Sequence, residues 1–333
     1  MDFKRFWVVA YPDLEKPIGG IKQLHRISEI LSALGHSSCL IQDSTSFHPN
    51  WFSSNVTTIS KTEFFNDISL DPTLDVVILP ETYVPIVHTI VDENIPRIIF
   101  NQNSSYTFGI KSAQFYKPSV ITSLYGFSSI KQVWCVSHHD RRFLSRSFSL
   151  SLDKVRLITN ALDLPLLPPK VSKKRQIVYM PRKNREDSSI VTTLLNNSEL
   201  ATSWAIKPIT GLSHDKVIAI MHESLIFLSF GFPEGFGLPV AEAMACGCAV
   251  IGYDGIGGRE LYHHADQYPG LAFSIQYGDW YAFIEAIREF DRNLRLFESD
   301  ILNDLHQLSI FIREKYCFDA MKSDVQAAIS SLS

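Results

Sequence analysis

At 333 residues, the chain is long enough for two domains of about 150 residues each, and its hydrophobic content of 45% is ordinary for a globular α/β protein. The formal net charge of −4 excludes a strongly basic footprint, so no nucleic-acid partner is expected. No signal segment opens the chain and no run of about 18 apolar residues occurs. We therefore expect no transmembrane segment and a cytoplasmic protein, either free or peripheral to a membrane.

The first half reads as one α/β domain over residues 1–163. Phe6 to Ala10 form an apolar run of buried-strand length, and residues 16–20 read as a loop. Apolar residues then recur at helical spacing from Ile21 to Leu34, until Gly35 ends the pattern. Further short strands are predicted at residues 38–42, 56–59, 76–79, 98–100 and 133–136.

Gly19 and Gly20 stand between the first strand and the first helix. They have an ordinary reading as a tight turn. Their functional reading is a place where the backbone approaches a phosphate closely at a helix start. From the residues alone, both readings stay open.

A second α/β domain is predicted over residues 170–315, after a linker with three prolines at residues 164–169. Its first strand, residues 176–180, runs into Arg182 and Lys183. These cations either belong to a solvated basic turn or neutralise a diphosphate, for which arginine offers a planar pair of donors. Helices are predicted at residues 215–223, 280–290, 301–316 and 319–332.

The cysteines are odd in number and mostly sit in apolar strings, so reduced thiols packed in the core are expected rather than disulfides. Cys246 and Cys248 lack the further ligand pair that a structural zinc requires, so no metal site is expected. The five are Cys39, Cys135, Cys246, Cys248 and Cys317.

Residues 226–260 form the most informative stretch. The apolar run 226–229 predicts a buried strand, and a loop rich in glycine and proline follows it. Strong helix formers from Pro239 to Ala245 predict a helix that Gly247 ends. A second strand at residues 249–251 completes a βαβ unit, whose ligands bind beyond the carboxyl ends of the strands.

Two carboxylates flank that crevice, Glu234 in the loop and Glu242 in the first helical turn, with seven residues between them. Both have ordinary readings: Glu242 complements the helix dipole, and Glu234 is a solvated loop residue. The functional reading is that Glu242 accepts hydrogen bonds from both hydroxyls of a ribose. Bare amides at the glycine turn would then hold a phosphate.

The string EGFGLPVAEAMACGCAVI, which begins at Glu234, closely resembles the signature of retaining, family-4-type glycosyltransferases (glycosyl transferases group 1) of the GT-B fold. The resemblance implies an α/β fold with two Rossmann-like domains facing across a cleft, and a C-terminal helix at residues 316–333 that crosses back to the first domain. It also implies transfer of a sugar from a nucleotide-diphosphate sugar to an acceptor hydroxyl, with retention. No metal or other cofactor is expected, because Arg182, Lys183 and the helix-end amides can neutralise the charge that a divalent ion would otherwise neutralise. The acceptor would be a glycan, a lipid-linked molecule or a small molecule.

The resemblance also assigns roles in the second domain. Glu234 contacts the donor sugar as a catalytic residue, and Glu242 binds the ribose. Arg182 matches an arginine that binds the donor diphosphate. The usual spacing would place a partner lysine near residues 187–189, so either Lys183 or Arg185 substitutes for it or this contact is missing. Donor oxygens are held by the backbone amides of Gly235, Phe236, Gly237 and Leu238.

In the first domain the resemblance is thinner. Gly19 and Gly20 resemble the N-terminal glycine loop that approaches the donor. Where family members carry a histidine, this chain has Asn101-Gln102-Asn103, and an amide can bond a sugar hydroxyl but cannot titrate. Asn101 is taken as the donor-binding candidate, with His88, His138 and His139 as alternatives.

Two other functions stay open. One is a nucleotide-sugar epimerase or hydrolase of the same fold, and the other is a catalytically silent subunit that binds a glycan or a nucleotide sugar. A dinucleotide-binding turn is disfavoured, because residues 255–258 do not read G-x-G-x-x-G. Residues 257–260 instead resemble the Gly-Gly-x-x-Glu turn of the glycosyltransferases, one residue shorter.

Overall fold

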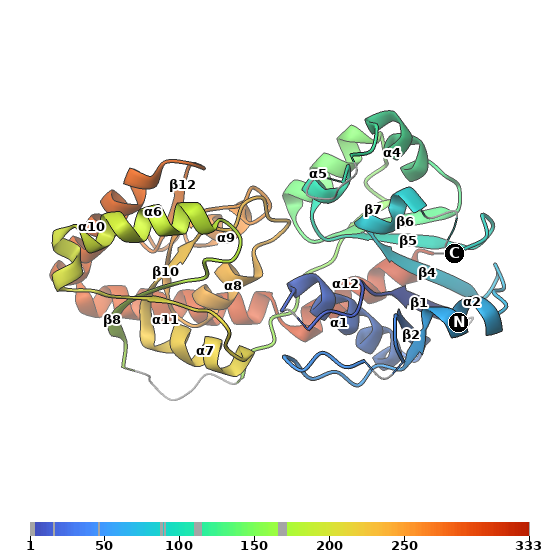
Figure 1. The fold of residues 1–333 in the computed structure, drawn as a ribbon, viewed down its shortest axis with the longest axis horizontal. Helices are drawn as coiled ribbons and strands as arrows, with labels where there is room; N and C mark the ends of the chain where they lie inside the picture. Colours follow the sequence, from blue (N-terminus) through green and yellow to red (C-terminus); the bar gives the residue numbers. More distant parts are fainter. Residues whose placement is uncertain are drawn as a thin grey trace. The chain divides into compact units, whose positions relative to one another are not determined.

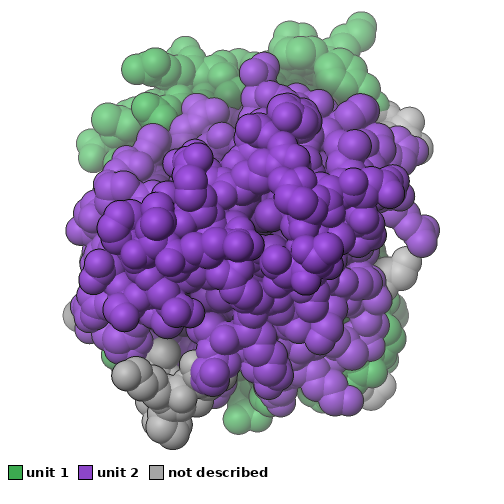
Figure 2. Space-filling view, turned by 90° about the vertical axis from the view of Figure 1, so that its left-hand side faces the viewer, with its two compact units in different colours: residues 1–161, 318–333 green, residues 162–317 purple. Residues whose placement is uncertain are grey.

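The computed structural model describes residues 4–15, 17–45, 47–86, 89, 91–109, 115–165 and 172–332. The chain forms two compact units, coloured separately in Figure 2: unit 1 holds residues 1–161 and 318–333, and unit 2 holds residues 162–317. Each unit carries one sheet (Figure 1). The predicted linker at residues 164–169 lies mostly outside the described residues, and so do His88 and residue 170, where the second domain was expected to begin.

Unit 1 is built on a seven-stranded sheet in the order β3-β2-β1-β4-β5-β6-β7, and its strand pairs are parallel. The order reverses between β1 and β4, as in Rossmann folds, so a ligand is expected beyond the carboxyl ends of these two strands. The strands are β1 (Arg5–Val9), β2 (Ser37–Gln42), β3 (Thr58–Ser60), β4 (Asp75–Pro80), β5 (Arg97–Asn101), β6 (Ile130–Cys135) and β7 (Val155–Leu157). The helical segments are α1 (Gly19–Ala33), α2 (Lys61–Asp67), η1 (Glu81–Ile86), η2 (Ser104–Tyr106), α4 (Pro118–Tyr125), α5 (His138–Ser147) and α12 (Phe318–Ser330).

Helix α1 begins two residues earlier than the hydrophobic spacing predicts. Gly19 and Gly20 are its first two residues, so the prediction of a loop over residues 16–20 is wrong at its end. The apolar spacing could not show this, because glycine adds no side chain to the buried face. Leu24, Ile27 and Leu31 of that face are fully buried, which fixes the helix on the sheet.

Unit 2 is built on a five-stranded sheet in the order β12-β11-β10-β8-β9, again with parallel pairs. Figure 1 shows α6 and α10 on one side of this sheet and α7, α8 and α11 on the other. The strands are β8 (Lys174–Tyr179), β9 (Ala205–Pro208), β10 (Ser224–Ser229), β11 (Ala249–Tyr253) and β12 (Ala272–Ile275). The helical segments are α6 (Arg185–Asn196), η3 (Glu199–Thr202), α7 (His214–Glu223), α8 (Leu238–Ala245), α9 (Arg259–His264), α10 (Trp280–Leu296) and α11 (Glu298–Lys315).

The central strands have the burial expected of parallel sheets covered on both faces. All six residues of β4 and all six residues of β10 are buried, which explains their nearly continuous apolar sequences. The edge strands β9 and β12 are partly exposed and carry weaker apolar patterns. The sequence pattern therefore locates the centre of each sheet better than its edges.

The last helix, α12, belongs to unit 1 although it follows unit 2 in the chain. Its buried side chains include Met321 and Val325. Gln132 of β6 donates through Nε2 to Ala328 O at 2.8 Å, and the Thr159 amide donates to Asp324 Oδ2 at 2.9 Å. These contacts attach the end of the chain to the sheet of the unit that holds its beginning.

Candidate functional site in unit 2

The order of strands in unit 2 selects one place for a ligand. Renumbered along the chain, the five strands are ordered 2-1-3-4-5, and the order reverses between β8 and β10. In such sheets the ligand crevice opens beyond the carboxyl ends of the two strands at the reversal. Strand β8 ends at Tyr179 and β10 ends at Ser229, so the segments starting at Met180 and Phe230 border the expected crevice.

The loop after β10 is held in place by glycines. A Cβ added at Gly231 would lie 2.6 Å from Glu234 Oε1, and one at Gly257 would lie 2.2 Å from Gly235 O. The two segments are also joined by backbone hydrogen bonds, Glu234 N to Gly255 O at 2.9 Å and Gly257 N to Glu234 O at 3.1 Å. The turn at residues 254–258 therefore supports Glu234 and the amides that follow it, and its close approach leaves no room for a side chain at Gly257.

Helix α8 starts at the predicted place but with a different first residue. Gly237 precedes it with a φ of 90°, which favours glycine, and the helix begins at Leu238 rather than Pro239. Glu242 is consequently the fifth helical residue, and no acidic side chain lies in the first turn. The expectation that Glu242 lies in the first turn is wrong. Since the helix dipole acts mainly within that turn, the ordinary explanation for Glu242 loses support.

Glu242 has a partner that the sequence did not reveal. His214, the first residue of α7, contacts Glu242 Oε1 through Nε2 at 2.9 Å, and the carboxylate is 9% exposed. A histidine at a helix start gives no pattern that distinguishes it from a surface residue. The contact fixes one carboxylate oxygen of the candidate ribose site.

The segment after β8 meets the segment after β10. Lys183 Nζ lies 2.8 Å from Glu234 Oε2, so two predicted site residues from different loops are paired. Asn184 donates through Nδ2 to Phe230 O at 2.6 Å and to Phe232 O at 3.2 Å. Arg182 is exposed and makes no hydrogen bond or ion pair with any residue that the structure describes. Its guanidinium is therefore available to an anionic ligand.

Asp187 stands where the glycosyltransferase spacing would place a lysine. It accepts hydrogen bonds from Tyr253 Oη and from Trp280 Nε1, both at 3.1 Å. Burial raises the pKa of Tyr253 to about 12, so this hydroxyl remains a donor at neutral pH. Asp187 thus ties α6 to β11 and α10, which leaves Lys183 as the lysine nearest to the loop of Glu234.

The far end of α8 carries cations. Lys173 donates to Cys246 O at 2.7 Å, and Arg313 donates through Nε to Ala245 O at 2.7 Å. Positive groups at a helix C-terminus stabilise the helix through its dipole. The cysteines in this region are free thiols, and burial raises the pKa of both Cys246 and Cys248. They are protonated packing residues.

In unit 1, the side chains of the adjacent residues Asn101 and Gln102 have different hydrogen-bond partners. Asn101 is fully buried and donates through Nδ2 to Thr107 Oγ1 at 2.9 Å and to Tyr125 Oη at 3.1 Å. Its neighbour Gln102 donates through Nε2 to Gly20 O at 3.2 Å. The geometry therefore favours Gln102 over Asn101 as the amide beside the glycine pair. Asn101 as a donor contact stays a prediction.

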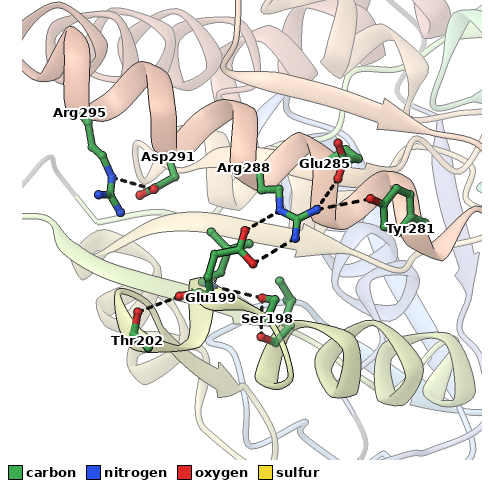
Figure 3. A network of polar contacts seen from close by, with 10 residues as sticks. Ser198, Glu199, Thr202, Tyr281, Glu285, Arg288, Asp291 and Arg295 are labelled. Atoms are coloured by element: carbon green, nitrogen blue, oxygen red, sulfur yellow. Dashed lines mark hydrogen bonds and ion pairs between the residues drawn. The ribbon is translucent and has the colours of Figure 1, made fainter.

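A second polar cluster lies between η3 and α10 (Figure 3). Arg288 contacts both carboxylate oxygens of Glu199, at 2.7 and 3.1 Å, and these bonds lower the pKa of Glu199 to about 2. Arg295 contacts Asp291 at 2.9 Å. A cavity of about 330 Å³ borders the cluster. Because these arginines are paired with carboxylates, we interpret the cluster as a tie between two segments and assign it no ligand.

Neither a metal site nor a membrane-spanning helix is found among the described residues. Within the ranges that the structure describes, no three His, Cys, Asp or Glu side chains form a group that could hold a metal ion. None of the described helices is long and apolar enough to cross a membrane.

Sequence comparisons match the second half of the chain. Residues 199–295 match the family model "Glycosyl transferases group 1". An alpha-1,6-glucosyltransferase of Actinobacillus pleuropneumoniae serotype 7 (strain AP76) is 39% identical over 72 residues, which are 22% of this chain and 19% of the relative. The "Putative glycosyltransferase ORF330" of Acidianus filamentous virus 2 (isolate Italy/Pozzuoli) is 29% identical over 116 residues, 34% of each chain. The chain thus matches about a fifth and a third of the length of these relatives.

Solved structures match along the whole chain. Sucrose-phosphate synthase from Thermosynechococcus elongatus superposes with a TM-score of 0.72 over 99% of both chains, at 14% identity. The pneumococcal O-GlcNAc transferase GtfA, solved with UDP and GlcNAc, gives a TM-score of 0.69 over 100% of this chain and 99% of that one, at 10% identity. The chain therefore has the GT-B fold of two Rossmann-like domains, and it resembles the group 1 glycosyltransferases, whose family model its residues 199–295 match.

Proposed function

We propose that the chain is a glycosyltransferase that moves a sugar from a nucleotide-diphosphate sugar to an acceptor hydroxyl, with retention and without a metal cofactor. One observation carries the proposal. Arg182, the ion pair of Lys183 with Glu234, and Glu242 all lie on the segments that follow β8 and β10, the two strands at the reversal of strand order in unit 2, where a ligand is expected. The match of residues 199–295 to the group 1 family supports it.

The nucleoside end of the donor binds at Glu242. A carboxylate can accept hydrogen bonds from both ribose hydroxyls, and charge-assisted bonds of this kind are about twice as strong as neutral ones. His214 holds Oε1 from the side of α7, so the carboxylate is oriented before the ligand arrives.

The diphosphate binds at Arg182, at Lys183 and at the amides of residues 235–238. Arg182 is exposed and unpaired within the described chain, and the amides open α8, where the helix dipole favours an anion. These groups neutralise the charge that grows on the leaving diphosphate as the glycosidic bond breaks. They supply the charge stabilisation that a divalent ion gives in other transferases.

Glu234 changes partner when the donor binds. Without a donor, it is paired with Lys183 at 2.8 Å. The diphosphate carries more charge than one carboxylate and competes for Lys183, which frees Glu234 to accept hydrogen bonds from sugar hydroxyls. Unit 1 contributes further candidate contacts to the substrate. They are Gly19, Gly20 and the side-chain amide of Gln102. The acceptor is a glycan, a lipid-linked molecule or a small molecule, and the enzyme works in the cytoplasm.

A thermal-shift screen of nucleotide-diphosphate sugars tests the donor site. A ligand at 100 times its dissociation constant stabilises the protein by about 2.7 kcal/mol. Glu242→Gln should weaken binding of the nucleotide by about 1 to 3 kcal/mol, the range for losing a charged hydrogen-bond partner. Glu289→Gln, an exposed carboxylate on α10, is the matched control and should bind normally. Equal affinity in both variants would remove Glu242 from the site.

Product analysis separates transfer from its rivals. Incubation with the donor that binds best should give a glycosylated product only when an acceptor is present, and NMR of the new linkage should show the anomeric configuration of the donor. Free sugar or an epimerised donor without acceptor would indicate a hydrolase or an epimerase. Tight binding with no turnover in a broad acceptor panel would indicate a silent binding subunit.

A further inference from the structure

Unit 1 also has a reversal of strand order, between β1 and β4, and one buried acid lies directly beside it. Glu81 follows the last residue of β4 and is 1% exposed. Its Oε2 accepts a hydrogen bond from the Gln102 amide at 3.2 Å. Its Oε1 is buried and has no hydrogen-bond partner among the described residues. Buried polar atoms without partners are rare, and each requires an explanation.

Glu81 is connected to the start of α1 through Gln102. The backbone N–H of Gln102 donates to Glu81 Oε2. The side chain of Gln102 donates through Nε2 to Gly20 O at 3.2 Å. A Cβ added at Gly20 would lie 3.2 Å from Gln102 Oε1 and 3.4 Å from the Tyr11 ring. Three segments that leave the carboxyl ends of β1, β4 and β5 therefore meet at Gly20, Glu81 and Gln102.

The surroundings of Glu81 favour its neutral form. Within the described chain it has no ion-pair partner, and the charged group that acts on it is Asp140 of α5. Burial raises the pKa of Glu81 from 4.5 to about 7; the backbone N–H groups of Gln102, Glu81 and Asn103 oppose this rise, and the charge of Asp140 adds to it. The other titratable neighbours are tyrosines: Tyr11 after β1, Tyr125 of α4, and Tyr83 and Tyr106, which adjoin Tyr11. Burial and the charge of Glu81 raise the pKa of Tyr11 and of Tyr125, so both remain uncharged hydroxyls.

We propose that Glu81 is a positioning residue for the transfer reaction and that it works as a neutral acid: Oε2 holds the backbone of Gln102, and the proton on Oε1 is donated toward a substrate hydroxyl or a water that bridges to it. This inference rests on the proposed function. Its ligand class is a polyhydroxyl substrate, because a sugar hydroxyl can accept that proton while donating its own to a neighbouring group.

Ionisation of Glu81 should disturb the same contacts. It removes the only proton that Oε1 can donate, and it leaves a buried charge without a cation among the described residues, which is costly. Neighbouring donors, the Tyr11 hydroxyl and the Gln102 side chain, would turn toward the new charge, and the Gln102 contact to Gly20 would be lost. The reaction should therefore slow as the pH rises through about 7.

The pH profile of the enzyme tests the inference. In the wild type, kcat/KM for the acceptor should fall about 10-fold per pH unit above about pH 7, the behaviour of a single essential proton. Glu81→Gln keeps the shape and a permanent N–H donor, so it should retain activity and flatten this limb. Glu81→Ala should lower kcat/KM at every pH. Glu93→Gln, an exposed carboxylate of the same unit, should keep the wild-type profile.

Infrared spectroscopy supplies a readout that does not depend on activity. A protonated carboxyl band should persist to about pH 7 in the wild type and be absent in Glu81→Gln. A missing band at about pH 6, or an unchanged acceptor profile in Glu81→Gln, would overturn the inference even while nucleotide sugars still bind and react. Conversely, a band that titrates as expected in a protein that transfers no sugar would contradict the proposed function and the positioning role together, and would leave Glu81 as a buried structural acid.

Discussion

Glu242 is recognised in the sequence by its place in a motif, whereas the structure shows which residue orients its carboxylate. Its position in the string at residues 234–251 suggested a ribose contact, and the ordinary alternative was a helix-dipole role. The structure places it beyond the first turn of α8 and beside His214. A partner 28 residues away in sequence cannot be found from spacing, because nothing local to His214 signals it.

His214 should matter only through Glu242. His214→Ala removes the group that fixes Glu242 Oε1, so the affinity for the nucleotide should fall about 5- to 10-fold, in line with the loss of about 1 kcal/mol for one hydrogen bond. His214→Gln retains a side-chain amide near the carboxylate and should recover part of the loss. Titration calorimetry measures both, with the exposed His306→Gln as a control that should bind normally. If His214→Ala bound the nucleotide with wild-type affinity, the contact of His214 with Glu242 would have no role in binding.

Arg182 should act on the rate rather than on binding. The diphosphate gains charge as the glycosidic bond breaks, and only contacts that strengthen in the transition state raise kcat. Arg182→Ala should lower kcat by about 10-fold or more at saturating donor, with a smaller change in the donor KM. Arg292→Ala, an exposed arginine of α10 without a described partner, is the control. Normal turnover in Arg182→Ala would move the assignment to Lys183 or Arg185.

At the scale of elements, the centre of each sheet and the βαβ unit at residues 226–251 were predictable, because strong apolar runs and glycine loops mark them. Edge strands β7, β9 and β12 were not predicted, since they are three or four residues long and partly exposed. Helices α10 and α11 extend through residues 291–300, where the sequence is mostly polar. There the ion pair of Asp291 with Arg295, four residues later, supports a helix that apolar spacing alone does not show.

Asn184 links the segments that follow two neighbouring strands, and the sequence did not reveal this link. Its amide joins the segment after β8, which carries Arg182 and Lys183, to the carbonyls of Phe230 and Phe232 after β10. Asn184→Asp replaces the donor with an acceptor facing two carbonyls, so it should lower kcat/KM for the donor more than Asn184→Ala does. Both variants should lower the melting temperature, but only a positioning role predicts that Asn184→Asp regains activity as the pH falls and its carboxyl gains a proton.

The control for this experiment is Asn196→Asp at the other end of α6, which should leave turnover unchanged. Equal losses in Asn184→Asp and Asn184→Ala at every pH would contradict the role, because only the aspartate can regain a donor. The pH at which activity returns would also report the pKa of the new carboxyl.

At the scale of the whole molecule, the two Rossmann-like domains were predicted from the resemblance to the glycosyltransferase signature. The local spacing of hydrophobic residues did not predict them. Hydrophobic spacing gives strands and helices, but the order of strands in a sheet depends on contacts between segments far apart in the chain. The pairing of β1 with both β2 and β4 is such a contact, and it creates the reversal beside Glu81. The pairing of β10 with β8 creates the second reversal, beside the proposed donor site. Both candidate sites therefore follow from topology, and their individual residues follow from the loops that topology brings together.

Helix α12 gives the last prediction, because it makes the stability of unit 1 depend on the final residues of the chain. Met321 is fully buried in unit 1. Met321→Ala should destabilise that unit by about 2 to 5 kcal/mol, the cost of a large-to-small change in a core. Because the proposed donor site lies in unit 2, the stabilisation of unit 2 by a nucleotide sugar should be unchanged. Met221→Ala, at a fully buried methionine of α7 in unit 2, should do the opposite and weaken the unit that binds the nucleotide.

Calorimetry with and without the nucleotide sugar measures both effects, and the exposed Gln326→Ala of α12 controls for changes in helix propensity. The nucleotide should raise the temperature of one unfolding transition. If Met321→Ala lowered the temperature of that same transition and left the other unchanged, α12 would have to stabilise unit 2 instead. Loss of both transitions together would mean that the two units unfold as one cooperative block, since independent units lose stability separately.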